Sequence, residues 1–134
     1  MYLNSLNENQ KHLFFKLAFS LAHVDGEYSP HEENLLKAYC SEMNIQFDAS
    51  MSVDSIHGLQ LEILETYDCN SVRVICFELV GLALTDEKFD NTEKEFIGEL
   101  VNLFGLDTSL IDECSKLISE YILLQKKINS VILN

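Results

Sequence analysis

Turn-forming residues are scarce in this sequence of 134 residues, which contains one proline and five glycines. Short strands joined by many tight turns need such residues, so the scarcity favours a few long elements over an all-β fold. Long apolar runs are also missing. The most apolar stretch, 74–84, contains Glu78 and is well short of the roughly 20 residues that a transmembrane helix needs. We therefore expect no membrane insertion.

Positive charge is scarce as well. Nine Lys and Arg residues oppose 22 Asp and Glu residues, and the net charge of −13 corresponds to a pI near 4.5. Such a field repels nucleic-acid phosphates and anionic bilayer surfaces, which argues against a nucleic-acid-binding protein. Cations and basic protein surfaces are the partners that this field attracts.

Motifs of several enzyme classes are lacking. The sequence has no G-x-S-x-G, no Gly-rich phosphate loop and no H-E-x-x-H, so we expect no enzyme and no catalytic residue. Residues 1–10 are polar and do not resemble a signal peptide. The four cysteines form neither a C-x-x-C pair nor a cluster, which favours free thiols in a reducing, cytoplasmic location over a disulfide framework. They are Cys40, Cys69, Cys76 and Cys114.

Apolar residues recur at spacings of three and four along nearly the whole chain, which is the period of a helix. With 47% hydrophobic and 23% charged residues, the composition is that of a globular protein. The sequence therefore predicts an all-α, single-domain bundle of about six to seven helices over 1–134. The apolar stripes cover 3–22, 35–43, 56–67, 72–83, 96–104 and 110–128, the last either continuing through Ile132 or breaking once.

Two helix starts carry capping signals. Ser29 is followed by a proline at the first helical position and by Glu32 three residues later, which predicts a capping box. Asp90 and Glu93 repeat this spacing with aspartate as the cap. Gly105 follows the fifth stripe, where a helix end favours a left-handed residue.

The chain also contains an internal repeat. A shift of 61 residues places Asp25 on Asp86 and Glu32 on Glu93, and it matches apolar positions on both sides. Each unit is an apolar helix ending in Leu-Ala, an acidic loop and a second apolar helix. We therefore predict two pseudo-symmetric helical hairpins. The repeat units cover about 14–47 and about 74–108.

The motif A-H-V-D-G-E-Y-S-P-H-E-E at 22–33 and its echo A-L-T-D-E-K-F-D-N-T-E-K at 83–94 resemble the TerB-like family. That family includes tellurite-resistance proteins and the N-terminal domain of a J-domain co-chaperone. The resemblance implies an all-α, pseudo-symmetric acidic domain linked to stress response, with a suggested divalent-cation site and no established catalysis. The echo departs from the family pattern at Glu87, where glycine is usual.

The repeated carboxylates are the candidate metal ligands, because hard cations such as Ca²⁺, Mg²⁺ and Mn²⁺ prefer clustered oxygen ligands. Helix capping boxes and Asx turns explain the presence of the same residues without a metal. An EF-hand is excluded, because a loop starting at Asp25 has Pro30 at the glycine position and Leu36 at the twelfth position. The candidate ligands are Asp25, Glu32, Asp86 and Glu93, with Glu27 and Asp90 as secondary candidates.

A protein-interaction or co-chaperone-type adaptor module without metal is the alternative. Its acidic surface would recruit a basic protein partner, and Tyr2, Phe47 and Val53 would mark a docking patch if they are exposed. A homodimer formed through the Ile-rich segment Ile128 to Leu133 is compatible with either function. We expect His23 to pack beside the end of the first long helix, although it could also supply a nitrogen ligand to zinc.

Overall fold

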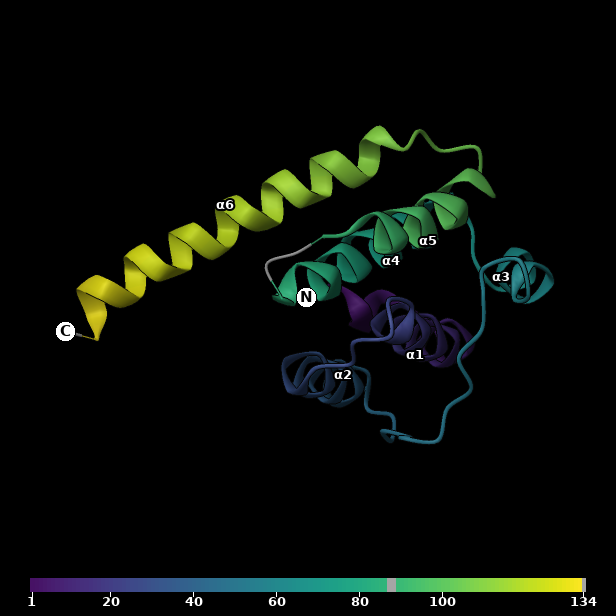
Figure 1. Ribbon diagram of the computed structural model, residues 1–134, viewed down its shortest axis with the longest axis horizontal. Coiled ribbons are helices and arrows are strands. Elements are labelled where there is room, and N and C mark those ends of the chain that lie inside the picture. Colours follow the sequence, from purple (N-terminus) through teal and green to yellow (C-terminus); the bar gives the residue numbers. More distant parts are fainter. Residues whose placement is uncertain (87–88, 134) are drawn as a thin grey trace.

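The computed structural model describes residues 1–86 and 89–133, except for the side chain of Asp86. Over this part of the chain, six α-helices and two short 3-10 helices make up all the regular structure and no strand occurs, which confirms the predicted all-α bundle (Figure 1). The elements are η1 (Leu3–Ser5), α1 (Glu8–His23), α2 (Pro30–Met43), α3 (Gln60–Thr66), α4 (Cys69–Ala83), η2 (Leu84–Asp86), α5 (Asn91–Asn102) and α6 (Ser109–Ile132).

The central element is α4, which packs against α1, α5 and α6. Its residues Ile75, Cys76, Leu79 and Val80 have no solvent exposure, because apolar side chains occur on most of its circumference. Contacts between α1 and α2 form one hairpin, and contacts between α4 and α5 form the other. The predicted repeat units, about 14–47 and about 74–108, include all of α2 and α5 but only the later parts of α1 and α4.

Repeated positions have matching environments. Leu21 and Leu82 are each 1% exposed, and Leu36 and its counterpart Ile97 are both fully buried. The members of each pair lie on equivalent helices of the two hairpins. Apolar positions that repeat in the sequence are therefore also buried at equivalent places in the structure.

Four of the α-helices begin with a capping box, in which the N-cap side chain accepts from the third helical residue and that residue's side chain accepts from the N-cap backbone. The boxes at Ser29 and Asp90 confirm the prediction. The other two capping boxes mark helix starts that the apolar stripes did not predict, because α1 begins only at Glu8 and α4 begins at Cys69. The four pairs are Asn7 with Gln10, Ser29 with Glu32, Asp68 with Ser71, and Asp90 with Glu93.

Of two further helices, one is shorter than predicted, and the other settles an alternative that the sequence left open. The stripe over 56–67 forms a helix only at Gln60–Thr66, and Leu59 offers no side-chain cap, although Ile56 and Leu59 are both buried. The last helix, α6, continues without a break to Ile132. Among the described helices, none combines the length and the apolar character that crossing a bilayer requires.

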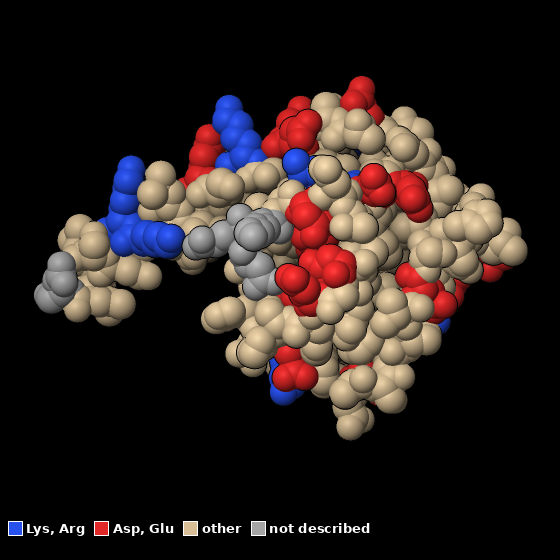
Figure 2. Space-filling model, viewed as in Figure 1, with Lys and Arg blue, Asp and Glu red and all other residues tan. Residues whose placement is uncertain are grey.

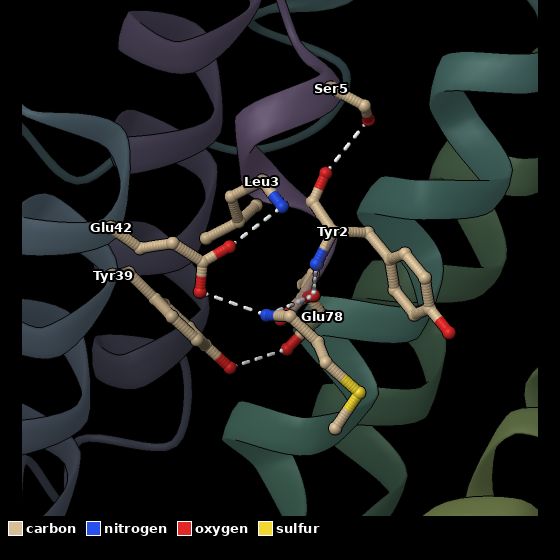
Figure 3. A network of polar contacts seen from close by, with 7 residues as sticks. Tyr2, Leu3, Ser5, Tyr39, Glu42 and Glu78 are labelled. Carbon is tan, nitrogen blue, oxygen red and sulfur yellow. Dashed lines mark hydrogen bonds and ion pairs between the residues drawn. The ribbon is translucent and has the colours of Figure 1, made fainter.

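The start of the chain is held between α2 and α4 by two glutamates (Figure 3). The Met1 ammonium lies 2.9 Å from Glu42 Oε1 and 3.0 Å from Glu78 Oε1. The backbone N–H groups of Tyr2 and Leu3 donate to Glu78 and Glu42, each at 2.9 Å. Because Glu78 is only 4% exposed, these donors compensate a carboxylate that would otherwise be buried at high cost.

Candidate functional site

The candidate site is formed by the two acidic loops that precede α2 and α5. In the first loop, Asp25 Oδ1 accepts from the Glu27 N–H at 2.9 Å, and Gly26 has a φ of +79° that the turn requires. In the second, Asp90 Oδ1 accepts from the Glu93 N–H at 2.9 Å. The Asp90 N–H donates in return to Glu93 Oε1 at 3.3 Å. Local hydrogen bonds therefore orient the carboxylates of both loops.

The structure brings three of the candidate ligands together, although they come from different hairpins. One carboxylate oxygen each of Asp25, Asp90 and Glu93 lies within 4.8 Å of the other two. Two oxygens bound to one Ca²⁺ at about 2.4 Å can be at most about 4.8 Å apart, so this spacing is compatible with a shared ion. Asp25 is exposed, Asp90 is half-buried and Glu93 is buried, so the cluster opens to solvent on the Asp25 side.

The cluster carries more negative charge than its surroundings neutralise. Burial is the main cause that raises the pKa of Glu93 to about 8. The hydrogen bond from the Asp90 backbone lowers this pKa, whereas the negative charges of Asp90, Asp25 and Glu32 raise it. Among the described residues, no Lys or Arg forms an ion pair with any of the three clustered carboxylates. A proton or a cation is therefore favoured at Glu93.

The remaining predicted ligands lie around this cluster. Glu32 is 3% exposed and accepts from the Ser29 N–H at 3.0 Å, and its charge contributes to the raised pKa of Glu93. Glu27 is exposed and takes part in the Asp25 turn through its backbone. The side chain of Asp86 lies outside the described part of the chain, as does Glu87. Asp90, a secondary candidate in the sequence, is thus one of the three convergent residues.

Aromatic packing fixes the end of α1 next to the first loop. His23 Nδ1 donates to the Phe19 carbonyl at 2.8 Å, and its ring stacks on Tyr28 with centroids 4.1 Å apart. The histidine packs beside the helix end as expected, and His23 does not belong to the carboxylate group above. Burial, followed by the charges of Glu33 and Glu32, raises the pKa of Tyr28 to about 12, so its hydroxyl keeps its proton.

Charge is unevenly distributed over the molecule. Among the charged residues visible in Figure 2, Asp and Glu predominate on the body, whereas Lys and Arg occur on the projecting end of the molecule and at a few places on the body. Comparisons of the chain with protein-family models, with curated proteins and with solved structures found no match. The geometry of the acidic loops is therefore what supports a function.

Proposed function

We propose that this chain is a non-enzymatic acidic domain of the TerB-like type that binds one divalent cation between its two acidic loops. Asp25, Asp90 and Glu93 are the proposed ligands, and the stress-response link is the one that the sequence resemblance implies. The observation that carries the proposal is the convergence of three carboxylate oxygens within 4.8 Å from loops about 61 residues apart.

The chemistry of the three ligands favours a hard cation. Carboxylate oxygens suit Ca²⁺, Mg²⁺ and Mn²⁺, and an exposed Asp25 leaves room for the water ligands that complete the coordination shell. Glu32 strengthens the attraction by adding negative charge without joining the group of three.

The test is a melting curve of chelator-stripped protein with and without each ion. An ion at 100 times its dissociation constant adds about 2.7 kcal/mol of stability, which raises the Tm of a domain of this size by roughly 10 °C. We expect a shift with one ion that exceeds the shifts with the other two. Equal, small shifts with all three ions would mean that the −13 surface is only being screened, and would count against the site.

Conservative variants identify the ligands. Asp90→Asn keeps a good N-cap, and Glu93→Gln keeps the capping box, so both remove charge with little change in helix stability. Each variant is expected to abolish the ion-specific shift. Glu65→Gln is the matched control, because it removes one negative charge from an exposed position on α3. If Glu65→Gln lowers the shift as much as Glu93→Gln, the effect is nonspecific.

The alternative is the adaptor module without metal. Its support is the exposure of Tyr2 and Val53, at 54% and 53%. Phe47 is half-buried, packs against Phe15 with centroids 5.7 Å apart, and lies under the Lys37 ammonium. It is therefore a poor docking residue. Capture of a basic protein that weakens with salt and ignores chelator would favour the adaptor over the cation site.

A further inference from the structure

The outer half of α6 has no covering element in the described part of the chain. Its inner half is anchored by Ile111, Cys114 and Ile118, which are all buried. Beyond that anchor, every residue from Ser119 to Leu133 is exposed, and the helix extends away from the bundle (Figure 1). A free helix of this length is marginally stable in water, so a partner that covers its apolar side would stabilise it.

The exposed apolar side of α6 from Leu117 to Val131 is a narrow seam. Five exposed apolar residues follow one another at spacings of four, three, four and three, which is the heptad pattern of a coiled coil. Tyr121 and Ile128 take the a positions, and the other three take the d positions. The seam residues and their exposed fractions are Leu117 57%, Tyr121 45%, Leu124 54%, Ile128 50% and Val131 77%.

The charges beside the seam distinguish between the two possible orientations of a second copy. Glu120 and Lys127 occupy the g positions. In a parallel pair, position g faces position e of the partner, so Glu120 would face an uncharged Gln125 and gain no ion pair. In an antiparallel pair, g faces g, so Glu120 meets Lys127 of the partner subunit. Two-fold symmetry then forms this ion pair twice.

The same antiparallel register aligns the apolar residues. When Glu120 faces Lys127 of the partner subunit, Tyr121 lies against Leu124 of the partner subunit and Leu117 lies against Ile128 of the partner subunit. Heptad geometry aligns the apolar layers whenever g faces g, so it is the two ion pairs that select this register among those that the seam allows.

Long-range repulsion also favours the antiparallel orientation. Each acidic body is attached to the inner half of its α6, so a parallel pair would place two bodies of high negative charge side by side. In the antiparallel register, Cys114 and its symmetry mate are separated by 17 residues along the pair, about 25 Å. This distance exceeds the Debye length of about 8 Å at physiological salt, so the bodies repel only weakly.

We propose that two copies of this chain associate through the outer halves of their α6 helices as an antiparallel, two-fold symmetric pair. Leu117, Tyr121, Leu124 and Ile128 of each copy form its apolar core, and Glu120 and Lys127 form its flanking ion pairs. These four apolar side chains each leave on the order of 100 Å² accessible, which together is about half of the roughly 800 Å² per partner of a standard interface, so a reversible dimer is expected. The proposal is independent of the cation site.

The first test is sedimentation equilibrium of the full chain from about 1 to about 100 µM. We expect a concentration-dependent species of twice the 15.3 kDa monomer mass. Leu124→Glu is expected to give a monomer whose bundle still unfolds cooperatively, because Leu124 is exposed in the single chain. A wild-type chain that stays monomeric overturns the proposal, including the case in which α6 binds another protein or a bilayer.

A charge exchange tests the register. Glu120→Lys alone and Lys127→Glu alone place like charges together, so each is expected to weaken the dimer at least tenfold. The double variant Glu120→Lys with Lys127→Glu restores opposite charges across an antiparallel pair, so its dimerisation is expected to return to the wild-type level. Double-variant dimerisation that stays as weak as in the single variants overturns the antiparallel register.

A distance measurement tests the orientation. Ser130→Cys provides an exposed attachment point for a spin label, and Cys69→Ser removes the exposed native thiol. The antiparallel pair places the two labels about 25 Å apart, since the equivalent residues are offset along the helix axes. A parallel pair places them at about the interaxial distance, roughly 10 Å, and a value near 10 Å would overturn the proposal.

Discussion

Glu32 and Glu93 occupy the same position in the two hairpins, and the charge of one raises the pKa of the other. Each is the third residue of its helix, and each accepts a hydrogen bond from its own N-cap, at 3.0 Å from Ser29 and 3.3 Å from Asp90. They are 3% and 4% exposed. Helix capping therefore accounts for the presence of both glutamates, while their proximity creates the excess negative charge at the site.

The raised pKa of Glu93 predicts a stability that falls as the pH rises. In the unfolded chain this carboxyl has its ordinary pKa of 4.5, and in the folded chain its pKa is about 8. The folded state thus binds more protons between these values, and the free energy of unfolding decreases from about pH 5 to about pH 8. Urea unfolding of metal-free protein at several pH values measures this slope.

Glu93→Gln is the control for that slope, because glutamine keeps the capping box and does not titrate. The variant is expected to lose most of the decrease between pH 5 and pH 8. An unchanged decrease in Glu93→Gln would show that other groups cause it.

Protons and cations are expected to compete at Glu93. At pH 6 the carboxyl is mostly protonated, and at pH 8.5 it is mostly ionised, so the affinity for the divalent ion should rise over this range. Binding near pH 7 should release close to one proton. Calorimetric titration in two buffers of different ionisation enthalpy measures that number. Binding without proton release would show that Glu93 is not a ligand.

The thiols are expected to fall into two classes. Cys69 is exposed, whereas Cys40, Cys76 and Cys114 are buried. Burial raises the pKa of Cys40 to about 11, and the neighbouring Cys114 thiol, together with burial, raises the pKa of Cys76. An aromatic disulfide reagent should therefore modify one thiol rapidly in native protein and four in denaturant.

Cys69→Ser should remove the rapid phase of that reaction. Any rapid modification of this variant would contradict the burial of the three remaining thiols, Cys40 on α2 and the pair Cys76 and Cys114 between α4 and α6.

Tyr39→Phe is expected to destabilise the bundle by about 1 kcal/mol. The buried Tyr39 hydroxyl donates to the Glu78 carbonyl at 2.9 Å, while the ring packs edge-on against Phe14 with centroids 5.5 Å apart. Phenylalanine keeps the ring contact and loses only the hydrogen bond. Thermal unfolding measures the difference, with Tyr2→Phe as an exposed control that should stay close to the wild type. Equal effects of the two substitutions would contradict the prediction.

The start of a helix was predictable from the sequence wherever a capping signal precedes it. Ser29 and Asp90 have side chains that cap and partners three residues later, so the starts of α2 and α5 were predictable. Asn7 and Asp68 carry the same kind of signal, which marks the true starts of α1 and α4 more sharply than the apolar stripes do. The shortness of α3 was not predictable, because Ile56 and Leu59 are buried in turns that match a helical spacing.

The sequence predicted that acidic residues of both loops form the candidate site, but it did not predict which of them come together. The repeat identified acidic residues in both loops, since charge and spacing are properties of the sequence. Which carboxylates converge depends on how one hairpin packs on the other, and it is Asp90, rather than Glu32, that lies within 4.8 Å of Asp25 and Glu93. The uncovered seam of α6 likewise became apparent only from the burial of each residue.

The ammonium group at Met1 affects how this protein should be produced. A purification tag fused before Met1 would replace that cation by a neutral amide next to Glu42 and Glu78. Unfolding and ion-binding measurements should therefore compare a chain that starts at this methionine with one that carries residues before it.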